Sequence, residues 1–218
     1  MRRAQWFAIA IFLIAASVYL PTLDDPALNW DDPEYIELPL LQQPDALAQI
    51  WTSFATPQVY PVVFTSFWID TLLWKGDLRG TRAVDLLLHG LVGVLAFCFL
   101  RSILGRRFGE GPAFVTALLF ALHPTQVATV AWIAERKNLL AAIFVLLALM
   151  ACRRATMRAD GRPARREWTA AYVFGFLAMF SKSTAVVLPL LVLWMEAWIP
   201  ARRPAAADVG GSGRWRSL

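Results

Sequence analysis

Residues 119–151 of the chain read LFALHPTQVATVAWIAERKNLLAAIFVLLALMA. One apolar run reaches Leu122, the pair His123-Pro124 interrupts it, and a second apolar run begins at Leu139 after the polar residues 135–138. Proline suits the first turn of a new helix but not a helix interior. The stretch therefore predicts apolar helices that are joined by a polar, broken segment.

The composition of the whole chain is that of a membrane protein. Of its 218 residues, 58% are hydrophobic and 17% are charged, whereas soluble domains are roughly 45–50% apolar and about 25% charged. A soluble domain of this length could not hide so much apolar surface, so lipid must cover the excess. The sequence contains no Walker loop, HExxH, GxSxG or CxxC motif, which leaves soluble NTPase, hydrolase and zinc-protease functions without support.

We predict an all-α membrane protein with about six transmembrane helices and a large first external loop. The predicted spans are residues 6–20, 84–100, 111–134, 139–151 and the two halves of 168–200, which Ser181-Lys182-Ser183 separates. Residues 168–200 are too long for one span of about 20 residues, although each half is short. A cleaved signal peptide is the alternative for residues 6–20.

Basic residues orient this arrangement. Most of the 21 Lys and Arg residues, including the clusters at 101–107, 153–166 and 202–203, fall on the side of the N-terminus. Cytoplasmic loops attract Lys and Arg, so we predict a multi-pass protein of a bacterial-type inner membrane whose N-terminus and C-terminal tail are cytoplasmic. The same asymmetry accounts for the net charge of +5 without nucleic-acid binding. Residues 201–218 are predicted to be a disordered tail.

The external loop, residues 21–83, is polar and aromatic. Within it, residues 60–74 carry large apolar side chains at helical spacing, which predicts either a helix on the membrane surface or a helix packed into the core of the loop. The adjacent carboxylates Asp31 and Asp32 could supply a general base or ligands for a divalent cation. The alternative is a solvated acidic loop in which Asp32-Pro33 starts a turn.

Two further polar clusters fall on the same predicted face. In the first, Arg136 and Lys137 stand at the membrane boundary, where a guanidinium and an ammonium can hold a phosphate; the alternative is anchoring by snorkelling side chains. The second is Lys182, whose position between apolar segments marks it as a functional candidate; the alternative is a turn that faces water. The full candidate set for substrate contacts is His123, Gln126, Glu135, Arg136, Lys137, Asn138 and Lys182.

Several motifs recur in this order in one membrane family. They are Trp30-Asp31-Asp32-x-x-Tyr35, Leu86-Leu87-Leu88-His89, Leu119-Phe120-Ala121-Leu122-His123-Pro124-x-x-Val127, Val130-Ala131-Trp132-Ile133-Ala134-Glu135-Arg136-Lys137-Asn138, and Ser181-Lys182 followed by Leu188-Pro189. On these motifs, residues 1–200 resemble the N-terminal membrane half of the TMTC-type O-mannosyltransferases of the glycosyltransferase-C superfamily.

The resemblance implies an inverting transferase that moves a sugar, mannose in this family, from a polyprenyl-phosphate donor to a hydroxyl of a protein or glycan on the external face. It implies Asp31 as the base, Asp32 as its polar neighbour, and the candidate set above as contacts for phosphate and acceptor. It implies a lipid-linked sugar as substrate and no metal, with a divalent cation at Asp31 and Asp32 as the alternative.

Family members continue beyond the region that residues 1–200 resemble. We therefore expect a truncated transmembrane domain, to which a second chain could supply the missing spans. The alternative function is that of a non-catalytic truncated membrane protein or a subunit of a split enzyme.

Overall fold

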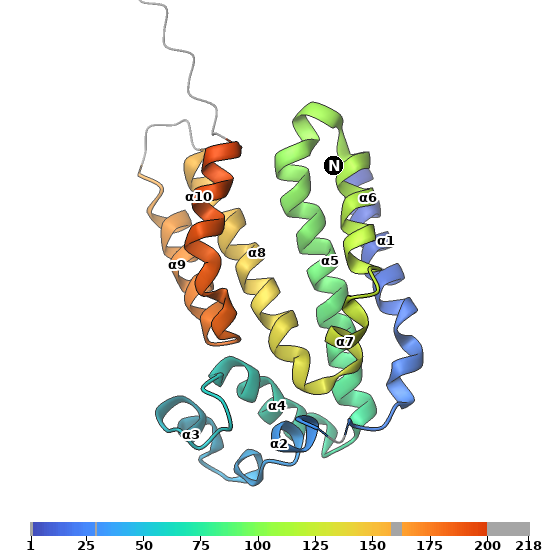
Figure 1. The fold of residues 1–218 in the computed structure, drawn as a ribbon, viewed down its shortest axis with the longest axis vertical. Helices are drawn as coiled ribbons and strands as arrows, with labels where there is room; N and C mark the ends of the chain where they lie inside the picture. Colours follow the sequence, from blue (N-terminus) through green and yellow to red (C-terminus); the bar gives the residue numbers. More distant parts are fainter. Residues whose placement is uncertain (1, 29, 158–162, 200–218) are drawn as a thin grey trace, which may run out of the picture.

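A computed structural model describes residues 2–28, 30–157 and 163–199, and these residues form helices without any strand (Figure 1). Six helices run along the long axis of the molecule: α1 (Arg2–Val18), α5 (Leu78–Phe108), α6 (Glu110–Ala121), α8 (Arg136–Thr156), α9 (Arg165–Met179) and α10 (Leu188–Trp198). The predicted all-α class is therefore confirmed for the described residues. The predicted tail, residues 201–218, lies outside them.

The segments of the predicted external loop gather at one end of this bundle (Figure 1). They are the short helices η1 (Leu20–Asp24), α2 (Asp32–Ile36), η2 (Pro39–Gln42) and α3 (Ala46–Thr52), followed by α4 (Pro61–Trp74). The connections α7 (Gln126–Ala131), η3 (Ile133–Glu135) and η4 (Ser183–Val187) complete the chain. The loop segments thus form a helical cap on one end of the bundle, which we call the loop cap.

Two of the described helical segments are long and apolar enough to cross a membrane, Leu78–Gly105 and Ile133–Thr156. The other apolar helices are shorter, for example Glu110–Ala121 with 12 residues. At 1.5 Å per residue such a helix is about 18 Å long, less than the roughly 30 Å of the hydrocarbon core. Length and composition therefore support two spans and do not confirm six.

Helix α5 extends beyond the predicted 84–100 at both ends because local signals set its bounds. The carboxylate of Asp77 accepts a hydrogen bond from the backbone N–H of Arg79 at 2.9 Å and caps the first turn. Gly109, at a φ of 77°, ends the helix and turns the chain into α6. One helix thus runs from the loop cap to the opposite end of the bundle.

Helix α5 packs against α1 and α6 on one side and α8 on the other. A Cβ at Gly90 would lie 2.8 Å from the ring of Phe12, and one at Gly93 would lie 2.9 Å from Ile11. These glycines let α1 approach closely, as small residues do between membrane helices. On α6, Ala113, Ala117 and Ala121 are fully buried and provide a similar small-residue face.

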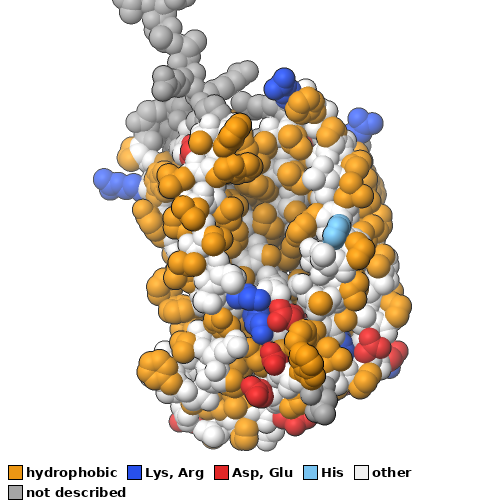
Figure 2. All heavy atoms as spheres, viewed as in Figure 1, with side chains coloured by type: hydrophobic (Ala, Val, Ile, Leu, Met, Phe, Trp, Pro, Cys, Tyr) orange, Lys and Arg blue, Asp and Glu red, His pale blue; other side chains and the backbone are white. Residues whose placement is uncertain are grey.

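The outside of the bundle is rich in exposed apolar side chains. Leu119, Phe176, Leu190 and Leu193 are each about 60% exposed or more, and Figure 2 shows apolar side chains over much of the helical surface. An apolar exterior of this extent supports membrane association.

Helix α4, residues 61–74, has one buried face and one exposed apolar face. Val63, Phe64 and Phe67 are buried in the core of the loop cap. On another face, Leu72 and Leu73 are 57% and 62% exposed. The core-packed alternative therefore holds for one face, while the other leaves an apolar surface at the end of the bundle.

Candidate active site

The first turn of α8 meets the loop cap at a cluster of opposite charges. The Nζ atom of Lys137 lies 3.2 Å from Glu135 Oε1 and 3.8 Å from Asp31 Oδ2. The Nζ atom of Lys182 lies 3.5 Å from the other oxygen of the same Glu135 carboxylate. Glu135 thus bridges two ammonium groups, and we call Asp31, Glu135, Lys137, Asn138 and Lys182 the charged cluster.

Asn138 fixes the positions of these groups. Its amide nitrogen donates to Glu135, and its amide oxygen accepts from Lys182. Figure 2 shows Lys, Arg, Asp and Glu side chains together in a hollow of the visible face, close to the loop cap. The structure therefore brings together five residues of the predicted site, from three segments of the chain.

Tyr35 contacts the charged cluster through Lys137, and the sequence analysis did not include it among the candidate site residues. It is buried between Phe64 and Phe67, with its ring stacked on that of Phe64. Its hydroxyl donates to Gln58 at 2.7 Å and accepts from Lys137 at 3.5 Å. Burial raises the pKa of this phenol, so at neutral pH it is a neutral donor and acceptor. In the sequence, the motif Trp30-Asp31-Asp32-x-x-Tyr35 was the signal that pointed to it.

Asp32 faces away from the charged cluster. Its side chain is fully buried, and its two oxygens accept hydrogen bonds from the backbone N–H groups of Leu28 at 2.8 Å and Ala134 at 2.7 Å. The geometry gives Asp32 a structural role in place of the catalytic one predicted for the pair. Each oxygen of Asp32 already accepts one backbone N–H, so the geometry gives no support to the alternative of a cation shared with Asp31.

Arg136 also leaves the predicted set of substrate contacts. Its guanidinium is fully buried, 2.6 Å from Asp70 and 2.6 Å from Asp85, and it lies 4.3 Å from the ring centroid of Phe67. It also donates to the carbonyl of Thr81 at 2.8 Å. Arg136 therefore ties α4 and α5 to the start of α8, and it does not face the charged cluster as a phosphate ligand would.

His123 and Gln126 are not brought into the cluster either. His123 is exposed, and its Nδ1 lies 2.8 Å from the hydroxyl of Thr125 in the turn between α6 and α7. Gln126 begins α7, and its backbone N–H donates to the carbonyl of His123. In the described part of the chain, neither side chain has a hydrogen bond or ion pair with the charged cluster.

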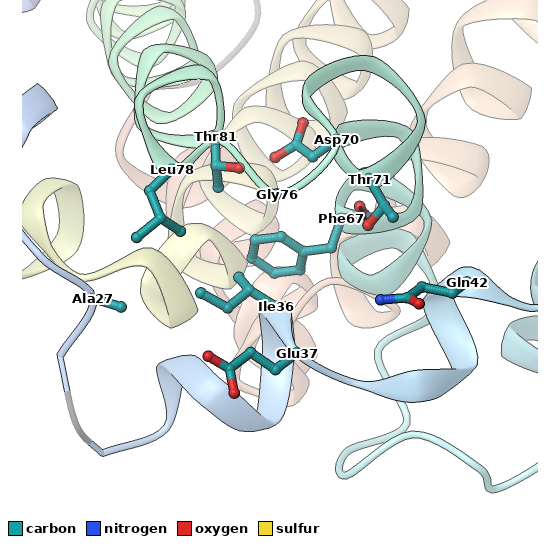
Figure 3. Close-up of a pocket in the computed structure, with 10 residues that line it drawn as sticks. All are labelled: Ala27, Ile36, Glu37, Gln42, Phe67, Asp70, Thr71, Gly76, Leu78 and Thr81. Carbon is teal, nitrogen blue, oxygen red and sulfur yellow. Dashed lines mark hydrogen bonds between the residues drawn. The ribbon is translucent and has the colours of Figure 1, made fainter.

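A cavity within the loop cap is lined in part by Phe67 (Figure 3). It has a volume of about 350 Å³ and is lined by residues of α2, η2, α4 and the start of α5, including Glu37 and Asp70. None of the predicted site residues is among the described residues that line it. This cavity and the charged cluster thus have no described residue in common.

Comparison with known proteins decides the family. A family model described as dolichyl-phosphate-mannose-protein mannosyltransferase matches residues 61–207. The chain belongs to this family. Within it, the chain has a TMTC-like domain, as the motifs predicted: it is 29% identical over 161 residues to the Caenorhabditis elegans protein O-mannosyl-transferase F38B6.6.

Two mammalian relatives give the same result. The chain is 37% identical over 95 residues to protein O-mannosyl-transferase TMTC1 of Mus musculus and 42% identical over 95 residues to that of Homo sapiens. The alignments cover 68% of this chain for the nematode relative and 43% for the mammalian ones, but only 23% and 10% of those proteins. The chain thus spans about a quarter or less of the length of these family members. No solved structure gives a significant match.

Arg82 is a further buried cation that sequence reasoning missed. Its guanidinium donates to three backbone carbonyls, those of Asp25 at 3.0 Å, Pro26 at 2.6 Å and Ala131 at 2.7 Å. It therefore joins the loop cap to α5 and α7. Arg82, Asp32 and Arg136 together hold the family domain's loop cap against the bundle, beside the charged cluster.

Proposed function

We propose that this chain forms the donor-binding part of a membrane mannosyltransferase that takes mannose from a polyprenyl phosphate. The observation that carries the proposal is the placement of the Asp31 carboxylate 3.8 Å from the Lys137 ammonium, with Lys182 on the far side of Glu135. A transferase of this kind needs a base for the acceptor and a cation for the leaving phosphate. The charged cluster holds both in one place.

Asp31 suits the base because an acceptor can reach it. Its side chain is 45% exposed, whereas that of Asp32 is fully enclosed. A base must come within hydrogen-bond distance of the proton that it removes. The exposed carboxylate of Asp31 meets this condition for a hydroxyl that arrives from the water side.

Lys137 and Lys182 are placed to bind the phosphate of the donor. Lys137 is 8% exposed and Lys182 is 23% exposed, so both ammonium groups act in a partly dehydrated setting, where their attraction for a phosphate is strengthened. In the proposed step, the acceptor oxygen bonds to the anomeric carbon, the bond from that carbon to the phosphate oxygen breaks, and the hydroxyl proton passes to Asp31. The bond electrons leave with the polyprenyl phosphate, whose charge Lys137 and Lys182 stabilise.

Attack from the side opposite the leaving phosphate inverts the anomeric carbon. Because this geometry puts the sugar between the base and the phosphate, the Asp31 carboxylate and the Lys137 ammonium, 3.8 Å apart without a donor, have to separate when the donor binds. The proposed step needs the loop cap on the external side of the membrane. The N-terminus and the C-terminal ends of α5 and α8 then lie on the cytoplasmic side. The distribution of Lys and Arg supports this orientation. A six-span arrangement, in which the shorter helices also cross, belongs to the same proposal.

The test is transfer of radiolabelled mannose from a synthetic polyprenyl phosphate-mannose by the chain reconstituted in liposomes. We expect Asp31→Asn to lower the rate at least about a hundredfold, as removal of a general base does. Lys137→Ala should lower it by a similar factor. The matched control is Glu34→Gln, because Glu34 is an exposed carboxylate in the first turn of α2, the short helix that Asp31 directly precedes. Equal rates for Asp31→Asn and Glu34→Gln would reject the assignment.

The alternative is a subunit that contributes the charged cluster to an enzyme completed by a second chain. The small share of each relative that the alignments cover favours testing it. The same assay distinguishes the two: transfer by the chain alone supports a self-sufficient enzyme. Transfer that appears only after co-expression with the later spans of a relative, and that still depends on Asp31, supports the subunit.

A further inference from the structure

A second charged cavity lies at the end of the bundle opposite the loop cap. It lies between α5 and α8, has a volume of about 770 Å³ and opens to the outside. Its described lining residues include Leu95, Arg101, Leu147, Met150, Arg153 and Arg154. The proposed transfer reaction uses none of these residues.

Three arginines and one acid give the cavity a positive charge. Arg101 pairs with Glu110 at 2.8 Å. Arg153 is buried, and its guanidinium donates to the carbonyl of Ser102 on α5 at 3.3 Å. Arg154 is exposed on the same helix as Arg153. The cavity therefore presents guanidinium groups from both of its walls, with one carboxylate among its described lining residues.

The depth of the cavity matches the second surface of a bilayer. On α8, Arg154 lies 17 positions after Lys137 of the charged cluster, a distance of about 26 Å along the helix axis. The hydrocarbon core of a bilayer is roughly 30 Å thick. If the charged cluster lies at one headgroup layer, Arg154 lies at the other.

The inner wall of the cavity is apolar. Leu95 lies on α5 and Leu147 and Met150 lie on α8, on the side of the arginines that faces the middle of the bundle. A ligand that fills this space needs a charged end for the arginines and an apolar part for the inner wall. A phospholipid has both.

We propose that this cavity binds the phosphate of an anionic phospholipid, with an acyl chain along Leu95, Leu147 and Met150. Guanidinium groups hold phosphate oxygens through paired hydrogen bonds, and basic pockets between membrane helices on the cytoplasmic side bind lipid headgroups in this way. The bound lipid contacts both α5 and α8 at the end of the bundle opposite the loop cap. The inference rests on the membrane placement proposed above, and not on the transfer step.

The test is native mass spectrometry of the purified chain in detergent, titrated with phosphatidylglycerol or phosphatidylcholine. We expect phosphatidylglycerol to be retained on the unmodified chain, and Arg101→Gln combined with Arg154→Gln to weaken this binding about tenfold or more. The matched control is Arg165→Gln with Arg166→Gln, which removes the same charge from exposed arginines of α9 that do not line the cavity. The control should change the affinity less than twofold.

Three results would overturn the inference: equal losses in the two double variants, equal retention of phosphatidylcholine, or displacement of the lipid by millimolar inorganic phosphate alone. The first would indicate diffuse surface charge, and the last a site for free phosphate. Asp31→Asn should retain phosphatidylglycerol at the unmodified affinity. Lipid binding that survives in a chain without mannose transfer would therefore separate failure of the proposed function from failure of this inference.

Discussion

Replacing Arg136 by methionine tests the buried ion triad at the junction between bundle and loop cap. The change keeps an unbranched side chain but removes the cation that lies 2.6 Å from both Asp70 and Asp85. Removing one partner of a buried ion pair costs about 3–5 kcal/mol, because a charge is left without compensation. We expect Arg136→Met to lower the free energy of unfolding by this amount.

The assay is equilibrium unfolding of the purified chain in mixed micelles, with increasing dodecyl sulfate and far-UV circular dichroism as the signal. The matched control is Arg79→Met, since Arg79 pairs with Asp24 at 3.1 Å with side chains 67% and 72% exposed. An exposed pair of this kind contributes under about 1 kcal/mol. Adding Asp70→Asn and Asp85→Asn to Arg136→Met should restore part of the loss, because no buried charge then remains unpaired.

Two results would refute this reasoning. The first is a loss for Arg136→Met no larger than that for Arg79→Met, which would mean that water reaches the triad and screens it. The second is a triple variant no more stable than Arg136→Met alone. In that case the loss would come from packing against the ring of Phe67, which lies 4.3 Å from the guanidinium, and not from charge.

Two other substitutions test the packing and the hydrogen bonds of the same fold. Asp32→Ala leaves two buried backbone N–H groups without an acceptor and should cost about 2–4 kcal/mol in the same titration; a cost no greater than that of Asp31→Ala would contradict the structural role. Gly90→Leu should lower the free energy of unfolding by about 1–3 kcal/mol, because even a Cβ there would lie 2.8 Å from the ring of Phe12. Its control is Gly111→Leu, which should cost little because nothing lies within 4 Å of a Cβ at that position. Similar losses for both variants would argue against close packing of α1 on α5.

The helix boundaries that the sequence predicted depend on local signals. Helix α6 ends at Ala121, close to the predicted break at His123-Pro124, and α9 ends at Met179, before the Ser181-Lys182-Ser183 interruption. A proline or a polar triplet ends a helix at its own position in the chain, so it can be recognised from the sequence alone. The convergence of Asp31, Lys137 and Lys182 was also anticipated, because charge asymmetry placed all three on one face.

The partners of buried charges could not be predicted in the same way. Asp85 is 51 residues from Arg136, and the amide that Asp32 binds is 102 residues away. Nothing in the local sequence distinguishes a carboxylate that faces a substrate from one that caps a distant backbone. The sequence therefore named the adjacent pairs Asp31-Asp32 and Arg136-Lys137 as units, and the fold divides each of them.

This division explains how the charged cluster is positioned. Successive residues of a helix point about 100° apart, so Arg136 can be buried against α4 and α5 while Lys137 faces the cluster. In the same way Asp32 is bonded to the backbone of Ala134, two residues before Arg136, while Asp31 is exposed. In each pair one residue is buried and holds the backbone, and its neighbour carries the charge that faces the cluster. The two buried residues hold the chain at nearby points, Asp32 at Ala134 and Arg136 at its own position. Asp32 and Arg136 therefore hold the backbone segments that carry Asp31 and Lys137, whose charged groups lie 3.8 Å apart.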